Sequence, residues 1–68
     1  MMKLVRLKEL REEAGFTQSQ LAEMLRIKQN TYSQYETGAR ELPYDYLITL
    51  SKIYSVSTDY ILGLRDDM

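Results

Sequence analysis

Hydrophobic residues recur along the chain at the three- and four-residue intervals of amphipathic helices. Leu4, Leu7, Leu10 and Ala14 share one face at this spacing, which predicts a first helix over residues 4–14. Similar stripes, with the start and stop signals between them, predict four more helices, over residues 18–25, 29–36, 44–54 and 58–63. The expected fold class is therefore all-α, in one domain over residues 1–68.

Start signals for two helices follow each other closely in the middle of the chain. Thr17, with Gln20 three residues later, has the spacing of a capping box. Ile27 and Tyr32 have the spacing of a hydrophobic staple around a helix that begins near residue 28. The connection, residues 25–27, is then only about three residues long, as in a helix-turn-helix unit.

The outer face of the predicted third helix is rich in amides. It carries one cation and no carboxylate, and consists of Lys28, Gln29, Asn30, Ser33 and Gln34. Asn and Gln can pair with two atoms of an adenine edge, so this face suits the reading of bases. Short polar residues also gather at helix starts because they cap free N–H groups. Composition by itself leaves both interpretations open.

Several short motifs, in order along the chain, resemble one known family. They are Thr17-Gln18-x-x-Leu21-Ala22, the turn at Ile27, Tyr32-Ser33-x-Tyr35-Glu36-x-Gly38, and Val56-Ser57-Thr58-Asp59-Tyr60-Ile61-Leu62-Gly63. This pattern is similar to the XRE (Cro/cI-type) helix-turn-helix family of prokaryotic and phage regulators, from about Leu7 to Leu64. The resemblance implies a compact five-helix, lambda-repressor-like DNA-binding domain whose second and third helices form the helix-turn-helix.

The resemblance also assigns roles on double-stranded DNA. The third helix would enter the major groove, where its base-reading residues would be Lys28, Gln29, Asn30, Ser33 and Gln34. The phosphate contacts would be Thr17, Gln18, Arg26 and Arg40. A phosphate at Gln18 fits the positive end of a helix dipole, although Gln18 is otherwise an ordinary solvated first-turn residue.

Arg11 lies on the inward stripe of the first helix, where a cation needs an explanation. In the family, an Arg at this position pairs with the Glu that ends the recognition helix, here Glu36. The alternative is a surface Arg whose stem covers apolar atoms while its head stays in water.

Two residues of the turn depart from the family's usual pattern. Arg26 stands where glycine is common. It adopts a positive φ at a cost of about 1 kcal/mol, or contacts a phosphate, or the turn is built differently. Lys28 stands where Ser or Thr more often caps the helix, so one backbone N–H loses a side-chain partner.

Composition excludes several classes of function. The chain has no Cys and no His, which rules out disulfides, the usual zinc sites and Cys/His catalysis. We therefore expect no enzyme activity, no metal and no cofactor. The apolar runs are too short to span a bilayer and the N-terminus lacks a signal-peptide core, so no membrane association and a cytoplasmic location are expected.

Charge is distributed unevenly, although the net charge of −1 at first argues against nucleic acid. Residues 1–40 carry seven Lys/Arg and five Glu, a net of +2. Residues 41–68 carry two Lys/Arg and five Asp/Glu, a net of −3. The positive half contains the helix-turn-helix. Non-specific DNA binding should be weak, so specificity would depend on base contacts and DNA shape.

The predicted function is sequence-specific transcriptional regulation, as a homodimeric repressor on a palindromic operator. A single module would bind weakly, and a two-fold dimer sets two recognition helices one DNA turn apart. The candidate dimer surface is Val56, Tyr60 and Leu64. The alternative is an antitoxin-like or partner-docking interaction module.

The helical positions of the six tyrosines predict two groups. Those expected in the core, with their hydroxyls at its rim, are Tyr32, Tyr35, Tyr44 and Tyr54. Those expected to be exposed are Tyr46 and Tyr60.

Overall fold

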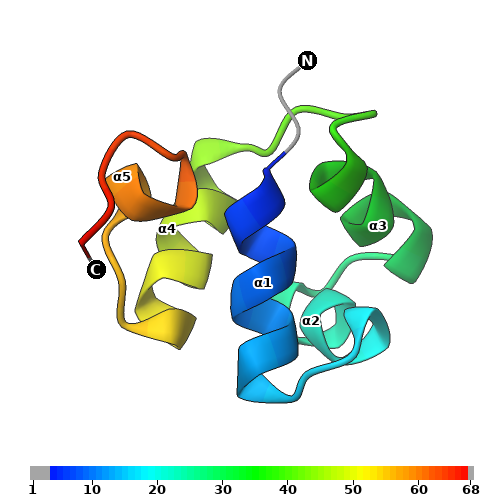
Figure 1. Ribbon diagram of the computed structural model, residues 1–68. Helices are drawn as coiled ribbons and strands as arrows, with labels where there is room; N and C mark the ends of the chain where they lie inside the picture. Colours follow the sequence, from blue (N-terminus) through cyan, green and yellow to red (C-terminus); the bar gives the residue numbers. More distant parts are fainter. Residues whose placement is uncertain (1–3, 68) are drawn as a thin grey trace.

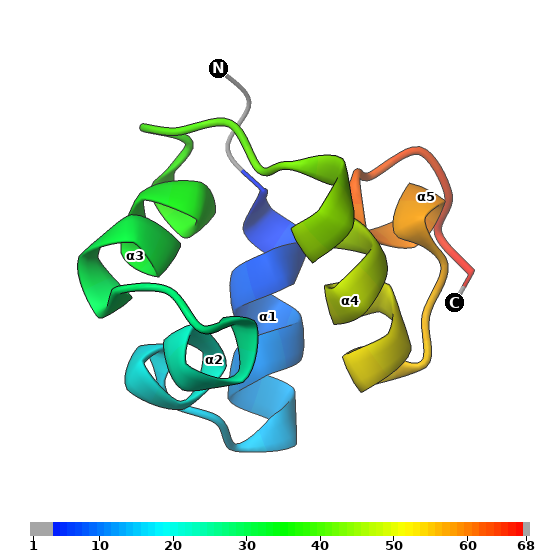
Figure 2. The same cartoon turned by 180° about the vertical axis from the view of Figure 1, so that it is seen from behind.

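The computed structural model describes residues 4–67 and confirms the all-α fold. Its helices are α1 (Val5–Ala14), α2 (Gln18–Leu25), α3 (Gln29–Thr37), α4 (Tyr44–Tyr54) and α5 (Thr58–Ile61). Helix α1 lies in the middle, with α2 and α3 on one side and α4 and α5 on the other (Figures 1 and 2). Within residues 4–67, none of the helices has the length and apolarity needed to cross a membrane.

The predicted helix ends agree closely with the structure except at α5. This helix was expected to reach residue 63 but ends at Ile61. Gly63 takes a φ of 80°, which is incompatible with an α-helix, and Leu64 N donates to Asp59 O at 2.8 Å. The glycine therefore stands beyond the helix, in a turn that satisfies its last carbonyls. At the other end, Ser57 Oγ accepts from Tyr60 N at 3.0 Å, as expected for a cap.

The core draws one fully buried side chain from each helix. In chain order these are Leu7, Leu21, Tyr32, Leu50 and Ile61. Because each helix supplies one of these side chains, displacing any helix would expose apolar area at a cost of about 1.5–3 kcal/mol per side chain. Helix α3, which carries the amide face, is thus held from behind by its own Tyr32.

Two tyrosines of α4 exchange their predicted places. Tyr44 is 81% exposed, whereas Tyr46 packs against the core with its ring centroid 6.1 Å from that of Tyr35. The reason is the position of the stripe: Tyr46 is four residues before Leu50 and shares its face, while Tyr44 starts the helix at the edge of the core. Pro43 is the residue immediately before the helix.

Burial is confirmed for the other three tyrosines expected in the core, but the hydroxyls of Tyr32 and Tyr54, expected at its rim, are themselves buried. Tyr32 and Tyr35 are buried and Tyr54 is half-buried. Tyr60 was expected to be exposed but is half-buried, because the Arg6 guanidinium lies 4.4 Å from its ring centroid. Arg6 also donates to Tyr60 O at 3.1 Å and pairs with Asp66 at 2.7 Å.

Candidate nucleic-acid interface

The turn between α2 and α3 is built around a left-handed residue. Arg26 has φ 59° and ψ 44°, and its N–H donates to Glu23 O at 3.1 Å. The next amide, Ile27 N, donates to Ala22 O at 2.9 Å. These bonds satisfy the last carbonyls of α2 and redirect the chain within residues 26–28. Of the three alternatives for Arg26, the positive φ is present; a phosphate contact stays a prediction.

The start of α2 is fixed by the predicted capping box. Thr17 Oγ1 accepts from Gln20 N at 3.1 Å, and Gln20 Oε1 accepts from Thr17 N at 2.8 Å. Thr17 remains exposed, so its hydroxyl hydrogen is available to a phosphate oxygen. The geometry is compatible with the predicted role of Thr17.

The amide face of α3 points away from the rest of the protein. Lys28, Gln29 and Asn30 are exposed, and Ser33 and Gln34 are half-exposed. On the opposite side of the same helix, the residues facing the core are Tyr32, Tyr35 and Glu36. No other helix of the described chain covers this face, which is the condition for entering a groove.

The capping explanation for the amides is not supported. Lys28 occupies the position before α3, where it forms no side-chain cap. Among residues 4–67, the side chains of Gln29, Asn30 and Ser33 have no hydrogen-bond partner. Their donors and acceptors are therefore free for a ligand, as are the backbone N–H groups that begin α3.

Gln34 differs from the other amides because a loop residue holds it. Its Oε1 accepts from Arg40 Nε at 3.0 Å, and its backbone O accepts from Arg40 N at 3.2 Å. Sequence reasoning missed this pair and expected Arg40 only as a phosphate contact. The available signal was Gly38, whose φ of 83° turns the chain back toward α3.

The predicted ion pair between Arg11 and Glu36 is present. Arg11 Nε donates to Glu36 Oε2 at 2.7 Å, with a longer contact of 3.4 Å from Nη2 to Oε1. The side chains are 12% and 4% exposed. Arg11 Nη1 also donates to Phe16 O at 3.0 Å, so one guanidinium joins α1, the following loop and α3. This pair fixes the back of α3 against α1.

Gln18 also contacts this pair rather than pointing freely outward. Its Nε2 donates to Glu36 Oε1 at 3.1 Å, and the residue is half-buried. A carboxylate has more lone pairs than one Arg fills, so the buried Glu36 takes this further donor. The solvated alternative is therefore wrong. A phosphate contact stays a prediction, because Nε2 has a second N–H donor besides the one that Glu36 accepts.

The hydrogen bonds around Glu36 keep it ionised. Burial is the largest influence and opposes ionisation, but the hydrogen bonds from Arg11 and Gln18, the nearby Tyr32 hydroxyl and the Arg11 charge outweigh it. The pKa of Glu36 is consequently lower than usual. The Tyr32 hydroxyl lies beside this carboxylate without a well-formed hydrogen bond. Burial, followed by the nearby Glu36 carboxylate, raises the pKa of Tyr32 above its usual value. Burial and the negative charge of Glu36 likewise raise the pKa of Tyr54 to about 12.

The three residues predicted for the dimer surface do not form one exposed patch. Leu64 is 71% exposed, but Val56 is only 8% exposed and belongs to the core. Val56 N donates to Ser51 O at 3.0 Å, which turns the residue inward after the α4 cap at Ser55. Tyr60 is half-buried beside Arg6. The prediction of Val56 as a surface residue is therefore wrong.

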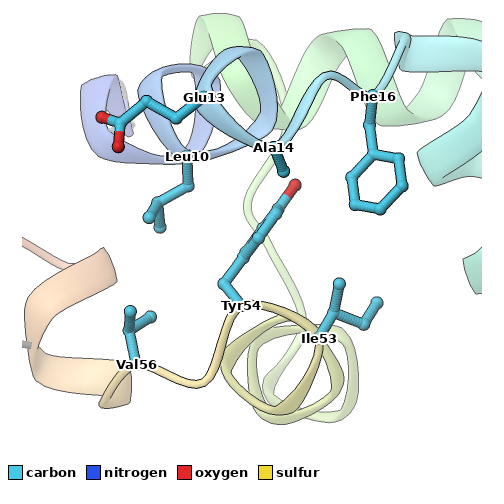
Figure 3. A pocket seen from close by; sticks show the side chains of 7 residues that line it. All are labelled: Leu10, Glu13, Ala14, Phe16, Ile53, Tyr54 and Val56. Atoms are coloured by element: carbon cyan, nitrogen blue, oxygen red, sulfur yellow. The ribbon is translucent and has the colours of Figure 1, made fainter.

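A separate hollow of about 390 Å³ lies between the C-terminal end of α1 and α4 (Figure 3). It is lined by Leu10, Glu13, Ala14, Phe16, Ile53, Tyr54 and Val56. The Tyr54 hydroxyl points toward Ala14, whereas the Glu13 carboxylate points away from the hollow (Figure 3). The lining is mostly apolar and its two polar groups are not directed at one point, so it offers no acid–base pair.

Comparisons with known proteins agree with this geometry. A family described as "Helix-turn-helix" matches residues 7–61. The HTH-type transcriptional regulator ImmR of Bacillus subtilis (strain 168) is 52% identical over 58 residues, which cover 85% of this chain and 46% of the relative.

Two further relatives come from the same strain. The uncharacterized HTH-type transcriptional regulator YobD is 45% identical over 62 residues, covering 91% of this chain and 55% of the relative. The SPbeta prophage-derived regulator YonR is 40% identical over 57 residues, covering 84% of this chain and 53% of the relative. The chain thus spans about half the length of these curated relatives.

Proposed function

Because this chain belongs to the XRE (Cro/cI-type) helix-turn-helix family, we propose that it binds double-stranded DNA sequence-specifically and regulates transcription. The observation that carries the proposal is the uncovered amide face of α3. Its relatives ImmR and YobD are named as transcriptional regulators, which supports the same role.

In this proposal, α3 enters the major groove with its N-terminal end leading. Gln29 and Asn30 then meet base edges first, with Lys28 and Ser33 beside them. Each well-formed bidentate pair discriminates against a wrong base by about 1–3 kcal/mol. Thr17 and Arg26 lie at the two ends of α2, and in this proposal both contact phosphates.

The regulator is proposed to act as a homodimeric repressor on a palindromic operator. One such module buries little DNA, whereas a two-fold pair places two recognition helices about 34 Å apart. Leu64 and the exposed edge of Tyr60 remain the proposed contact between copies. Occlusion of polymerase by the bound dimer is the simplest route to repression, because it requires no effector site.

The alternative is a module that docks a protein partner. Two apolar side chains on one face of α4, Tyr44 and Ile48, are 81% and 47% exposed. The half of the chain that contains them carries a net charge of −3. Exposed apolar residues in an acidic surrounding fit a protein surface better than DNA.

The salt dependence of DNA binding separates the two functions. Selection from a random DNA pool should recover related sequences, and log K for them should fall linearly with log salt, by about 0.9 per phosphate contacted. Half-sites about 10 base pairs apart would support the dimer. If no sequence binds even at low salt, the DNA-binding proposal is wrong and the partner-docking module is favoured.

Replacing Arg26 with glycine tests its proposed phosphate contact. Glycine adopts a positive φ without strain, which should stabilise the protein by about 1–2 kcal/mol. It also raises the conformational entropy of the unfolded chain, which should destabilise the protein by about 0.4–1 kcal/mol. Ser55→Gly is the matched control, because Ser55 also has a left-handed φ, of 55°, and lies at the end of α4. Both variants should have equal or higher melting temperatures.

Only Arg26→Gly should alter DNA binding. Loss of one phosphate contact should reduce the magnitude of the salt slope by about one, whereas Ser55→Gly should keep the parent slope. Equal slopes in all three proteins would show that Arg26 serves the turn without touching DNA.

A further inference from the structure

We propose that Arg40 determines which base Gln34 recognises, by holding the Gln34 amide so that its NH2 group faces DNA. On this proposal Gln34 selects a base edge made of acceptors, namely guanine, rather than adenine. The inference rests on the proposed function, since it assumes that α3 lies in the major groove. It assigns Arg40 as a positioning residue for specificity, in addition to any phosphate contact.

The orientation of the Gln34 amide follows from the chemistry of its partner. A guanidinium donates and never accepts, so the atom 3.0 Å from Arg40 Nε must be the amide oxygen. The NH2 group is on the other arm of the planar amide and is therefore turned away from Arg40 Nε. Asn30 and Gln29, in contrast, have no such partner within residues 4–67 and can present either end.

Arg40 is itself held in place by the backbone. Gly38 has a φ of 83°, and Arg40 N then donates to Gln34 O at 3.2 Å. Thr37 Oγ1 donates to the same carbonyl at 3.3 Å and accepts from Ala39 N at 3.4 Å. The loop after α3 is thus folded onto the last turn that carries Gln34. The two side chains that form the bond from Arg40 Nε to Gln34 Oε1 are therefore both attached to ordered backbone.

The donors and acceptors of the base edges decide what this arrangement selects. An unrestrained Gln pairs with adenine by using its oxygen toward N6 and its nitrogen toward N7. When the Gln34 oxygen is directed at Arg40, the group that faces the DNA is the Gln34 NH2, which is a donor. The nearby Arg40 guanidinium adds further donors. Guanine presents two acceptors in the major groove, O6 and N7, whereas adenine presents a donor beside its acceptor. A donor pair therefore favours guanine.

Prior ordering also strengthens the contact. A free Gln on a helix surface loses side-chain rotamer freedom when it binds a base, which costs affinity. The bond from Arg40 imposes that order before DNA arrives. Removing the Arg40 side chain should thus affect one base pair of the site more than the others.

The test uses four variants of the whole chain: Gln34→Ala, Arg40→Ala, Arg40→Lys and the Gln34→Ala/Arg40→Ala double variant. For each, affinity is measured on the site selected by the parent, on all its single base-pair changes, and on random DNA. The control is Arg65→Ala, which removes an exposed Arg outside α3 and its loop. Unfolding midpoints should match the parent because Gln34 and Arg40 are not in the core.

The expected result is loss of discrimination at one shared base pair, a guanine in the parent site. Gln34→Ala and Arg40→Ala should each reduce discrimination at this base pair by about fivefold to 100-fold. The double variant should lose no more discrimination than either single variant. Arg40→Lys keeps the charge, so its affinity for random DNA should stay near the parent value. It lacks the Nε–H donor, so discrimination should still fall.

Three outcomes would overturn the inference. One is that Arg40→Ala weakens all sequences alike and Arg40→Lys restores them, which leaves Arg40 as a phosphate contact and the proposed function intact. Another is that Gln34 discriminates for adenine in the parent. The third, no DNA binding by the parent at any sequence, removes the proposed function and this inference together.

Discussion

Replacing Arg11 with methionine should remove most of the protein's stability at room temperature. The change leaves the Glu36 carboxylate, only 4% exposed, without its cationic partner. Breaking a buried ion pair from one side costs about 3–5 kcal/mol. Arg11 keeps a 12% exposed edge, so we expect about 3 kcal/mol, the lower end of that range. The core of so short a chain supplies only about 3–5 kcal/mol in total.

The pH dependence identifies the cause of that loss. In the parent, the pKa of Glu36 is lowered, so the stability it contributes is present above its ordinary pKa of 4.5 and is lost as the pH falls below it. Without Arg11, burial should raise the pKa of Glu36. Protonation of Glu36 at acidic pH would then remove the buried unpaired charge that destabilises the variant. The difference in unfolding free energy between the two proteins should therefore shrink as the pH falls toward about 4.

Urea unfolding followed by circular dichroism, at neutral and acidic pH, would measure both effects. Arg65→Met is the matched control, because its pair with Asp67 is exposed and should be screened by water. We expect the control to unfold at the parent's urea concentration. A difference for Arg11→Met that is the same at every pH would mean that lost packing, and not the stranded charge, destabilises it.

Replacing Gln29 and Asn30 together with alanine should abolish most of the discrimination between the selected site and random DNA. Each residue is exposed at the leading end of α3, and each is expected to contribute about 1–3 kcal/mol. The double variant should lose about 2–6 kcal/mol on the selected site if the contributions add. Random DNA should be bound almost as before, because neither residue carries charge.

This variant should remain folded, since alanine is the best helix former and neither side chain reaches the core. Affinity by fluorescence anisotropy on both DNAs would measure the effect. Thr49→Ala, an exposed change on α4, is the control and should leave both affinities unchanged. Equal losses on the two DNAs would show that these amides contact the backbone and that another face reads the bases.

Local signals in the chain were sufficient for the helices and for much of the interface. The capping box at Thr17 and Gln20 depends on atoms three residues apart, and it formed as predicted. The exposed amides of α3 follow from helical periodicity, because Tyr32 and Tyr35 define the opposite, buried face. The pair of Arg11 with Glu36 spans 25 residues, and only the family resemblance made it predictable.

The failures occur where the outcome depends on a neighbour outside the segment. Val56 has an apolar side chain in either environment, and its burial was decided by where α5 folds back. The alternative of a solvated Gln18 is wrong because its amide nitrogen donates to a carboxylate of α3 that has a spare lone pair. Tyr44 and Tyr46 each lie about one turn before a buried leucine of α4, and the position of Tyr44 at the edge of the core made the difference.

The sequence by itself therefore determined which segments become helices, which face of α3 is polar and that no Cys or His side chain is present, because these depend on composition and short-range spacing. The tertiary structure decided how polar atoms are shared among neighbours: Glu36 between Arg11 and Gln18, and the Gln34 oxygen with Arg40. A hydrogen bond depends on direction and on distances of about 3 Å between atoms from different segments. Such distances exist only after the helices have packed.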